Sequence, residues 1–172
     1  ILGWGRGKGT LKAKRRDVRH RWGEEENKKG LKRIRVLKQK TYTKNATKVK
    51  GVSNSEIQIG RDNHYYLHKL KAANPNVKAA KYAFTKQKDA GNLMMLSGIS
   101  MVKHTKHPKN AQKLIAFLLS EKSQAHFTNK IYEYPTRIGI KPNNALPAIS
   151  HLMSQVPQQH LADVGGTLKL LR

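Results

Sequence analysis

The spacing of apolar and polar positions changes along the chain, and each spacing predicts an element. Residues 24–37 open with three glutamates, which suit the first turn of a helix, and continue with a thin apolar stripe of helical period. Residues 45–54 predict a second, shorter helix. Polar and apolar residues alternate over 56–60, which predicts a strand.

A third helix is expected directly after this strand. Asp62 or Asn63 is placed to cap it, because short polar side chains accept hydrogen bonds from the first turn. The apolar positions continue through Leu70, and the Asn-Pro-Asn sequence at 74–76 ends the helix.

Strands and helices are also expected in the second half of the chain. Strands are expected over 77–85 and 93–103, and helices over 108–118, from Ser120 to about Asn129, over 146–153 and over 167–171. Pro108 suits the first turn of its helix, where the missing N–H costs no hydrogen bond. Strands that alternate with helices favour an α/β fold.

Composition adds a strong positive charge to this pattern. The formal net charge is +25, and roughly half of the Lys and Arg lie in the first fifty residues. The run Lys12–Arg21, with Trp4 and Trp22 on either side, has the charge and aromatic rings to contact nucleic acid, but no recognised nucleic-acid-binding motif accompanies it. The alternative is a solvated, charged helix face. Apolar residues make up 37% of the chain, so we expect a lean core.

The chain's other patterns exclude several kinds of chemistry. It has no cysteine, which excludes disulfides, zinc–thiolate sites and thiol catalysis. No nucleophile–base motif is visible, so an enzyme is not expected. The glycine-rich start lacks the Ser or Thr that a phosphate-binding P-loop needs after its lysine, because Gly9 follows Lys8. An anion-binding turn with amides near Gly9 and Thr10 remains open, as does a plain flexible turn.

The adjacent phenols of Tyr65 and Tyr66 are the clearest candidate for chemistry. They lie at the expected start of a helix, where the backbone amides and the helix dipole favour negative charge. A trivalent cation would displace the phenol protons, and hard oxygen ligands suit ferric iron. Aromatic packing on an amphipathic helix is the more frequent role of such a pair. The pair alone therefore leaves both interpretations open.

Several segments, with the tyrosine pair among them, resemble one known family in the same order along the chain. The matching segments are residues 1–11, 22–25, 41–45, 55–60, 63–67, 96–104, 110–118, 120–121 and 132–135. They resemble the bacterial periplasmic ferric-iron-binding proteins, the solute receptors of iron ABC transporters. The resemblance covers about residues 1–142 and begins near the family's midpoint, so the chain looks like a C-terminal portion.

The resemblance implies a two-lobed, type II periplasmic-binding-protein fold, incomplete at the N-terminus. Residues 1–95 would form part of the C-terminal lobe, 96–146 would return to the N-terminal lobe, and 147–172 would form C-terminal helices. The implied partner is an ABC transporter permease in the inner membrane, and the implied location is the periplasm.

The resemblance also implies a site. Tyr65 and Tyr66 correspond to the residues that ligate Fe³⁺. A synergistic anion, phosphate or carbonate, would be held at four positions, which are Gly9, Thr10, Asn45 and Asn63. The family's further His and carboxylate ligands have no counterpart here. Lys48 and Gly51 stand where the family tends to place small apolar helix residues. A nucleic-acid-binding protein and a receptor for another small anion are the alternatives.

Overall fold

The computed structural model describes residues 1–4, 9–81 and 94–149. The contacts within the chain define two compact units, one that holds Ile1–Met94 and one that consists of Met95–Ile149. In the described residues, no helix has both the length and the apolar character needed to cross a membrane.

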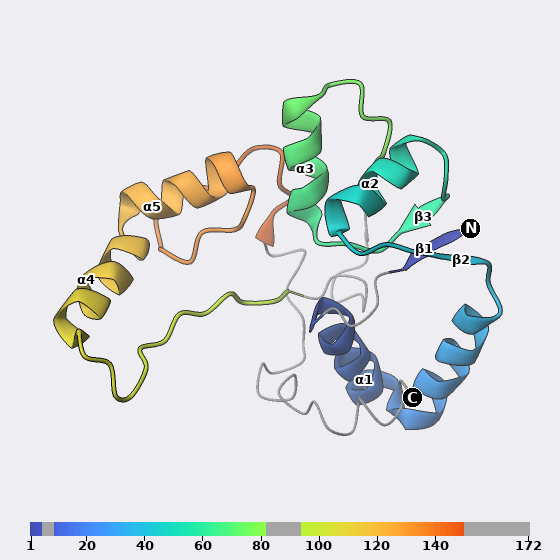
Figure 1. Ribbon diagram of the computed structural model, residues 1–172, viewed down its shortest axis with the longest axis horizontal. Helices are drawn as coiled ribbons and strands as arrows, with labels where there is room; N and C mark the ends of the chain where they lie inside the picture. The colour runs from blue at the N-terminus through green and yellow to red at the C-terminus, as the bar shows by residue number, and fades with distance from the viewer. Residues whose placement is uncertain (5–8, 82–93, 150–172) are drawn as a thin grey trace. The chain divides into compact units, whose positions relative to one another are not determined.

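The first unit is built on a small parallel sheet (Figure 1). Its strands are β1 (Leu2–Trp4), β2 (Gln39–Thr41) and β3 (Ile59–Gly60), in the order β2-β1-β3. Both neighbours run parallel to β1, and Gly3 at its centre is in register with Lys40 and Gly60. The β2 strand was not predicted from the sequence.

Each strand of this sheet is followed by a helix. The helices are α1 (Gly9–Arg35), α2 (Asn45–Ser53) and α3 (His64–Ala73). Both α2 and α3 confirm predicted helices. The carboxyl ends of parallel strands lie at one edge of a sheet, so all three helices begin at that edge.

Helix α1 is interrupted at Gly23. This residue has φ 81° and ψ 172°, a conformation that is open to glycine and unfavourable for other residues. A helical segment therefore restarts at Glu24, as the sequence predicts, and it ends at Arg35. Leu31 is buried, whereas Leu37 beyond the helix is half exposed.

A small apolar core joins α2 to α3. Its buried members are Val49, Leu67 and Ala79, and four partly buried residues pack against them: Val52, Tyr66, Leu70 and Val77. The strand predicted over 77–85 is wrong for 77–81, which form no strand. Their backbone is held by the end of α2 instead, because the Lys78 amide donates to Ser53 Oγ at 3.1 Å. Residues 82–85 lie outside the described residues.

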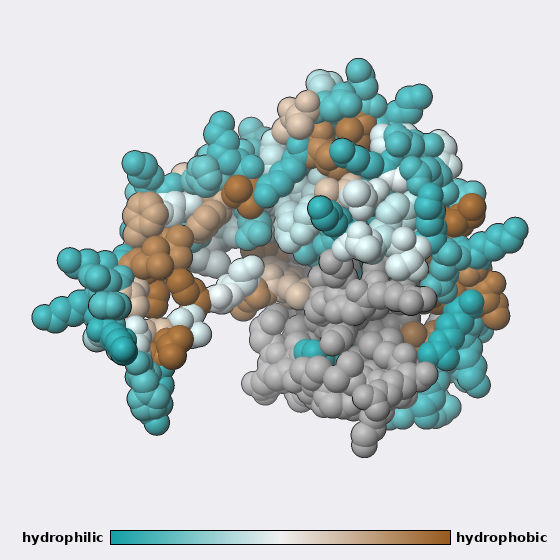
Figure 2. All heavy atoms as spheres, in the orientation of Figure 1, coloured by the Kyte–Doolittle hydropathy of each residue, from teal (hydrophilic) through white to brown (hydrophobic). Residues whose placement is uncertain are grey.

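The second unit contains α4 (Pro108–Leu118), α5 (Glu121–His126) and the π-helical turn η1 (Phe127–Ile131). Two predictions are confirmed here. Pro108 lies in the first turn of α4, and Ser120 caps α5 by accepting a hydrogen bond from the Ser123 amide. Apolar side chains of α4 remain at the surface, and Figure 2 shows brown atoms among teal ones in this part of the molecule.

Polar contacts hold the segment after η1. The Thr136 amide donates to Gln124 Oε1 at 2.8 Å, and the Asn143 amide donates to the buried Thr128 Oγ1 at 2.8 Å. The Tyr134 hydroxyl donates to the Pro147 carbonyl at 2.7 Å.

Two predictions in the second unit are wrong over some of the residues that the structure describes. Residues 94–103 form no strand, and Leu96 and Val102 are exposed. A segment rich in apolar residues does not form a strand without a paired neighbour, and the described part of this unit contains no strand. Residues 146–148 are not helical either, because Leu146 closes a turn on Asn143 and precedes Pro147, which disfavours helical backbone before it. Residues 150–153 and 167–171 lie outside the described residues.

Candidate metal centre

Three helix N-termini meet the carboxyl edge of the sheet in the first unit. Gly9 and Thr10 are the first residues of α1, Asn45 is the first residue of α2, and Asn63 is the N-cap of α3. The chain leaves central β1 for one neighbour and later crosses to the other, and ligands of open α/β sheets bind at such switch points. Helix N-termini attract anions, so this edge suits an anion.

The two candidate metal ligands lie in the first turn of α3. The rings of Tyr65 and Tyr66 are both half-buried, with centroids 4.5 Å apart and planes tilted by 42°. Tyr66 packs against the α2–α3 core. Aromatic packing is therefore part of what this residue does, alongside any role for its hydroxyl.

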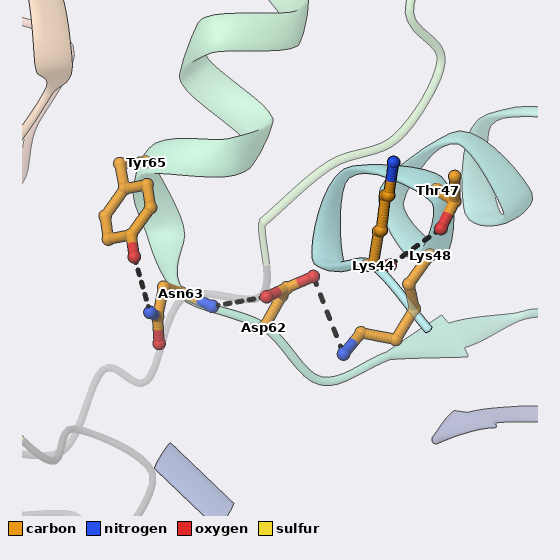
Figure 3. Close-up of polar contacts among 6 residues, drawn as sticks. All are labelled: Lys44, Thr47, Lys48, Asp62, Asn63 and Tyr65. Carbon is orange, nitrogen blue, oxygen red and sulfur yellow. Dashed lines mark hydrogen bonds and ion pairs between the residues drawn. The ribbon is translucent and has the colours of Figure 1, made fainter. Parts of the chain in front are cut away.

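The hydroxyl of Tyr65 is held by a neighbour. Asn63 Nδ2 donates to Tyr65 Oη at 2.8 Å (Figure 3). The Lys69 ammonium lies 5.7 Å from the centroid of the Tyr65 ring. The amide donor contacts the phenol oxygen itself, which is the atom that would ligate a metal.

The side chain of Asn63 does not cap α3 as the sequence predicted. Asn63 occupies the N-cap position, but its side chain makes no capping hydrogen bond, because its amide is directed to Tyr65. Asp62 does not cap either: its Oδ1 accepts from the Asn63 backbone amide at 2.9 Å. Both side chains thus position residues around the tyrosine pair.

Beyond Asp62 lies a contact that sequence reasoning missed. Lys48 of α2 is buried, and its ammonium lies 3.6 Å from Asp62 Oδ2 (Figure 3). The only signal in the sequence was that Lys48 stands where a small apolar residue was expected. Nothing in the local pattern linked Lys48 to Asp62.

Other groups supply few alternative ligands. The rings of His64 and His68 on α3 lie 6.2 Å apart in an edge-on arrangement. His104 and His107 are exposed in the second unit. In the parts of the chain that the structure describes, no group of three or more His, Cys, Asp or Glu residues is arranged to hold a metal ion. The tyrosine pair is thus the leading metal candidate in the described residues.

Comparisons with known proteins identify the family and the fold of the chain. Residues 10–151 match the family model described as bacterial extracellular solute-binding protein. The chain is 33% identical over 109 residues to the major ferric iron-binding protein of Neisseria meningitidis, and 30% identical over 111 residues to iron uptake protein A1 of Synechocystis. These matches cover 61% and 62% of this chain and 33% and 31% of the relatives.

A solved structure is similar over nearly the whole chain. The iron-bound HitA from Pseudomonas aeruginosa matches with a TM-score of 0.90 and 29% identity, over 98% of this chain and 55% of that one. The chain thus spans about a third of the curated relatives and about half of HitA. It has the α/β fold of periplasmic binding proteins, over part of that fold's length. The chain belongs to the bacterial extracellular solute-binding protein family.

Proposed function

We propose that this chain forms part of a ferric-iron receptor, in which Tyr65 and Tyr66 ligate Fe³⁺ as tyrosinates beside a synergistic anion. The observation that supports this most directly is the Tyr65 hydroxyl, which Asn63 holds at 2.8 Å beside the ring of Tyr66. The names of the relatives add to it, since they are described as ferric iron-binding, iron uptake and iron-bound proteins.

The donor set fits this cargo. Phenolate oxygen is a hard ligand, and a trivalent cation stabilises it by replacing the proton. Phosphate or carbonate would bind at the carboxyl edge of the sheet, where four residues lie at helix N-termini: Gly9, Thr10, Asn45 and Asn63. Because the anion offsets cation charge, metal and anion would bind together. The anion, water and ligands from outside the described residues would complete the coordination.

The same proposal places the protein in transport. Solute-binding proteins deliver their cargo, so the partner would be an ABC transporter permease in the inner membrane and the location would be the periplasm. Residues 1–95 would belong to the lobe with the tyrosine pair, and 96–146 to the return toward the other lobe. The proposal includes no catalytic step.

Adding ferric iron and inorganic phosphate to the 172-residue chain tests the metal site. The expected result is a visible phenolate-to-iron charge-transfer band that depends on phosphate. The variant with both Tyr65→Phe and Tyr66→Phe should lose the band. Tyr134→Phe is the matched control, because Tyr134 lies in the other compact unit and its hydroxyl contacts the Pro147 carbonyl.

An unchanged spectrum of the intact chain would refute the metal site. Calorimetry with phosphate alone then separates the alternatives. Phosphate binding without any iron effect would favour a receptor for a small anion, in which the tyrosines only pack and hydrogen-bond.

A further inference from the structure

Lys48 is a buried lysine for which the sheet below it leaves room. Only 3% of the residue is exposed, although it lies on α2, a helix that packs against β1 and β3. A Cβ built on Gly3 would lie 3.1 Å from Lys48 Cγ, and one built on Gly60 would lie 3.3 Å from it. Gly3 and Gly60 are paired in register across β1 and β3. The Lys48 stem thus crosses the sheet where two adjacent strands both lack side chains.

The lysine stem ends at a buried carboxylate. Lys48 Nζ and Asp62 Oδ2 are 3.6 Å apart, and only 4% and 9% of the two side chains are exposed. Removing a charge from water is costly unless an opposite charge is close. Each residue therefore makes the burial of the other tolerable, and Asp62 is fixed from the side of α2.

The fixed carboxylate connects directly to the candidate metal centre. Asp62 Oδ1 accepts from the Asn63 backbone amide at 2.9 Å, and Asn63 Nδ2 donates to Tyr65 Oη at 2.8 Å. Figure 3 shows these contacts in sequence, from Lys48 through Asp62 and Asn63 to Tyr65. Lys44, at the N-cap of α2, differs from Lys48 because it is exposed. Its carbonyl accepts a hydrogen bond from Thr47 Oγ1.

We propose that the buried Lys48–Asp62 ion pair is a positioning device, which holds Asn63 in the orientation that directs the Tyr65 hydroxyl toward its cargo. This inference rests on the proposed ferric-iron site and adds two residues behind it. Groups that orient a metal ligand from behind commonly change metal affinity by about 10- to 100-fold when they are removed. Lys48 and Asp62 would be groups of this kind, since they would act on the ligand Tyr65 through Asn63 and would not contact the metal themselves.

The test compares variants of the full 172-residue chain. Lys48→Met keeps the stem and removes the charge, which leaves the buried Asp62 without its cation. Adding Asp62→Asn removes that unbalanced charge and keeps an oxygen that accepts from the Asn63 amide. Adding Asp62→Val to Lys48→Met instead removes the acceptor. Lys50→Met is the matched control, since it makes the same charge change at an exposed position of α2.

The first measurement needs no iron. In amide NMR spectra, the Asn63 side-chain resonances report its bond to Tyr65, and they are assigned by their loss in Asn63→Ser. They should shift in Lys48→Met and in Lys48→Met/Asp62→Val. They should stay at the parent position in Lys50→Met and return toward it in Lys48→Met/Asp62→Asn. Parent-like Asn63 resonances in both double variants would overturn the proposal, even where Lys48→Met alone fails to fold.

The second measurement is the affinity for ferric iron in the presence of phosphate, from titration of the charge-transfer band. We expect an affinity about tenfold weaker in Lys48→Met/Asp62→Val than in Lys48→Met/Asp62→Asn. Equal affinities in these two variants would overturn the positioning role. A parent chain without the band would refute the proposed iron site, and with it the proposal that Lys48 and Asp62 serve that site. A parent chain that shows the band, together with equal affinities in the two double variants, would refute the positioning role alone.

Discussion

Replacing Gly3 by alanine tests how closely the centre of the sheet is packed. A Cβ at this position would lie 2.2 Å from Ile57 Cδ1 and 3.1 Å from Lys48 Cγ. Ile57 is 1% exposed, so its side chain has little room to move away. Overpacking of this kind costs about 1–3 kcal/mol, and alanine regains about 0.5–1 kcal/mol relative to glycine within a strand. A separation of 2.2 Å lies far inside van der Waals contact, so the upper part of the overpacking range, about 2–3 kcal/mol, applies. After the gain from alanine is subtracted, the expected net loss of stability is about 1–2.5 kcal/mol.

A second substitution tests whether Ile57 Cδ1 is the atom that the new Cβ meets. Ile57→Val removes Cδ1, and on its own it should cost about 0.5–1.5 kcal/mol. In the double variant the alanine Cβ occupies the space that Cδ1 has left. Gly3→Ala/Ile57→Val should then be about as stable as Ile57→Val alone, with a coupling energy within the range of about 0.5–3 kcal/mol seen for residues in contact. The milder contact with Lys48 Cγ remains in both alanine variants.

Urea unfolding followed by far-UV circular dichroism measures the four corners of this cycle. The free energies are comparable when the slope with urea is the same for all four proteins. A neutral or stabilising Gly3→Ala would refute the close packing at β1. Strict additivity of the two substitutions would show that Ile57 Cδ1 is not the atom that the new Cβ meets.

Two further predictions concern the second unit. Ser120→Ala should remove the cap of α5, which lowers stability by about 1 kcal/mol and speeds hydrogen exchange at the Ser123 amide. The control Ser100→Ala, at an exposed position, should change neither the stability nor this exchange rate. An unchanged exchange rate at the Ser123 amide in Ser120→Ala would contradict the cap. Burial raises the pKa of Tyr134 from 10.0 to about 12, so its contribution to stability is complete below pH 10 and is lost as the pH rises through the folded value. An alkaline titration of phenolate absorbance should therefore lose its late step in Tyr134→Phe, and loss of a step at the ordinary tyrosine pKa would contradict this burial.

Elements with local signals were predictable from the sequence. Pro108 and Ser120 mark the starts of α4 and α5 because the first turn of a helix has its own hydrogen-bonding needs. Strands depend on partners that are distant in sequence. All three residues of β2 are exposed and polar, so no apolar pattern predicted this strand. The segment 94–103 is rich in apolar residues, but it has no strand beside it in the described part of its unit.

Part of the candidate site was likewise predictable from local sequence, and part depends on residues that are distant in sequence. The place of Tyr65 at a helix start and the N-cap position of Asn63 follow from a strand, a polar pair and an amphipathic run in sequence. The partner of Asp62 does not, because Lys48 lies on a different helix and would ordinarily be expected at its surface. Only the parallel pairing of β1 with β3 brings Gly3 and Gly60 together beneath the lysine stem.

The positive charge is therefore accommodated in two physically different ways. Along the second half of α1, Lys28 and Lys29 pair with glutamates one turn earlier, and all of these side chains are 42–77% exposed. Exposed pairs of this kind contribute little to stability, and water would solvate either partner alone. Lys48 differs because water does not solvate its buried ammonium. Its stem lies against Gly3 and Gly60, and its charge is balanced by Asp62. Lys48 is thus connected to the candidate metal centre from within the fold, through Asp62 and Asn63.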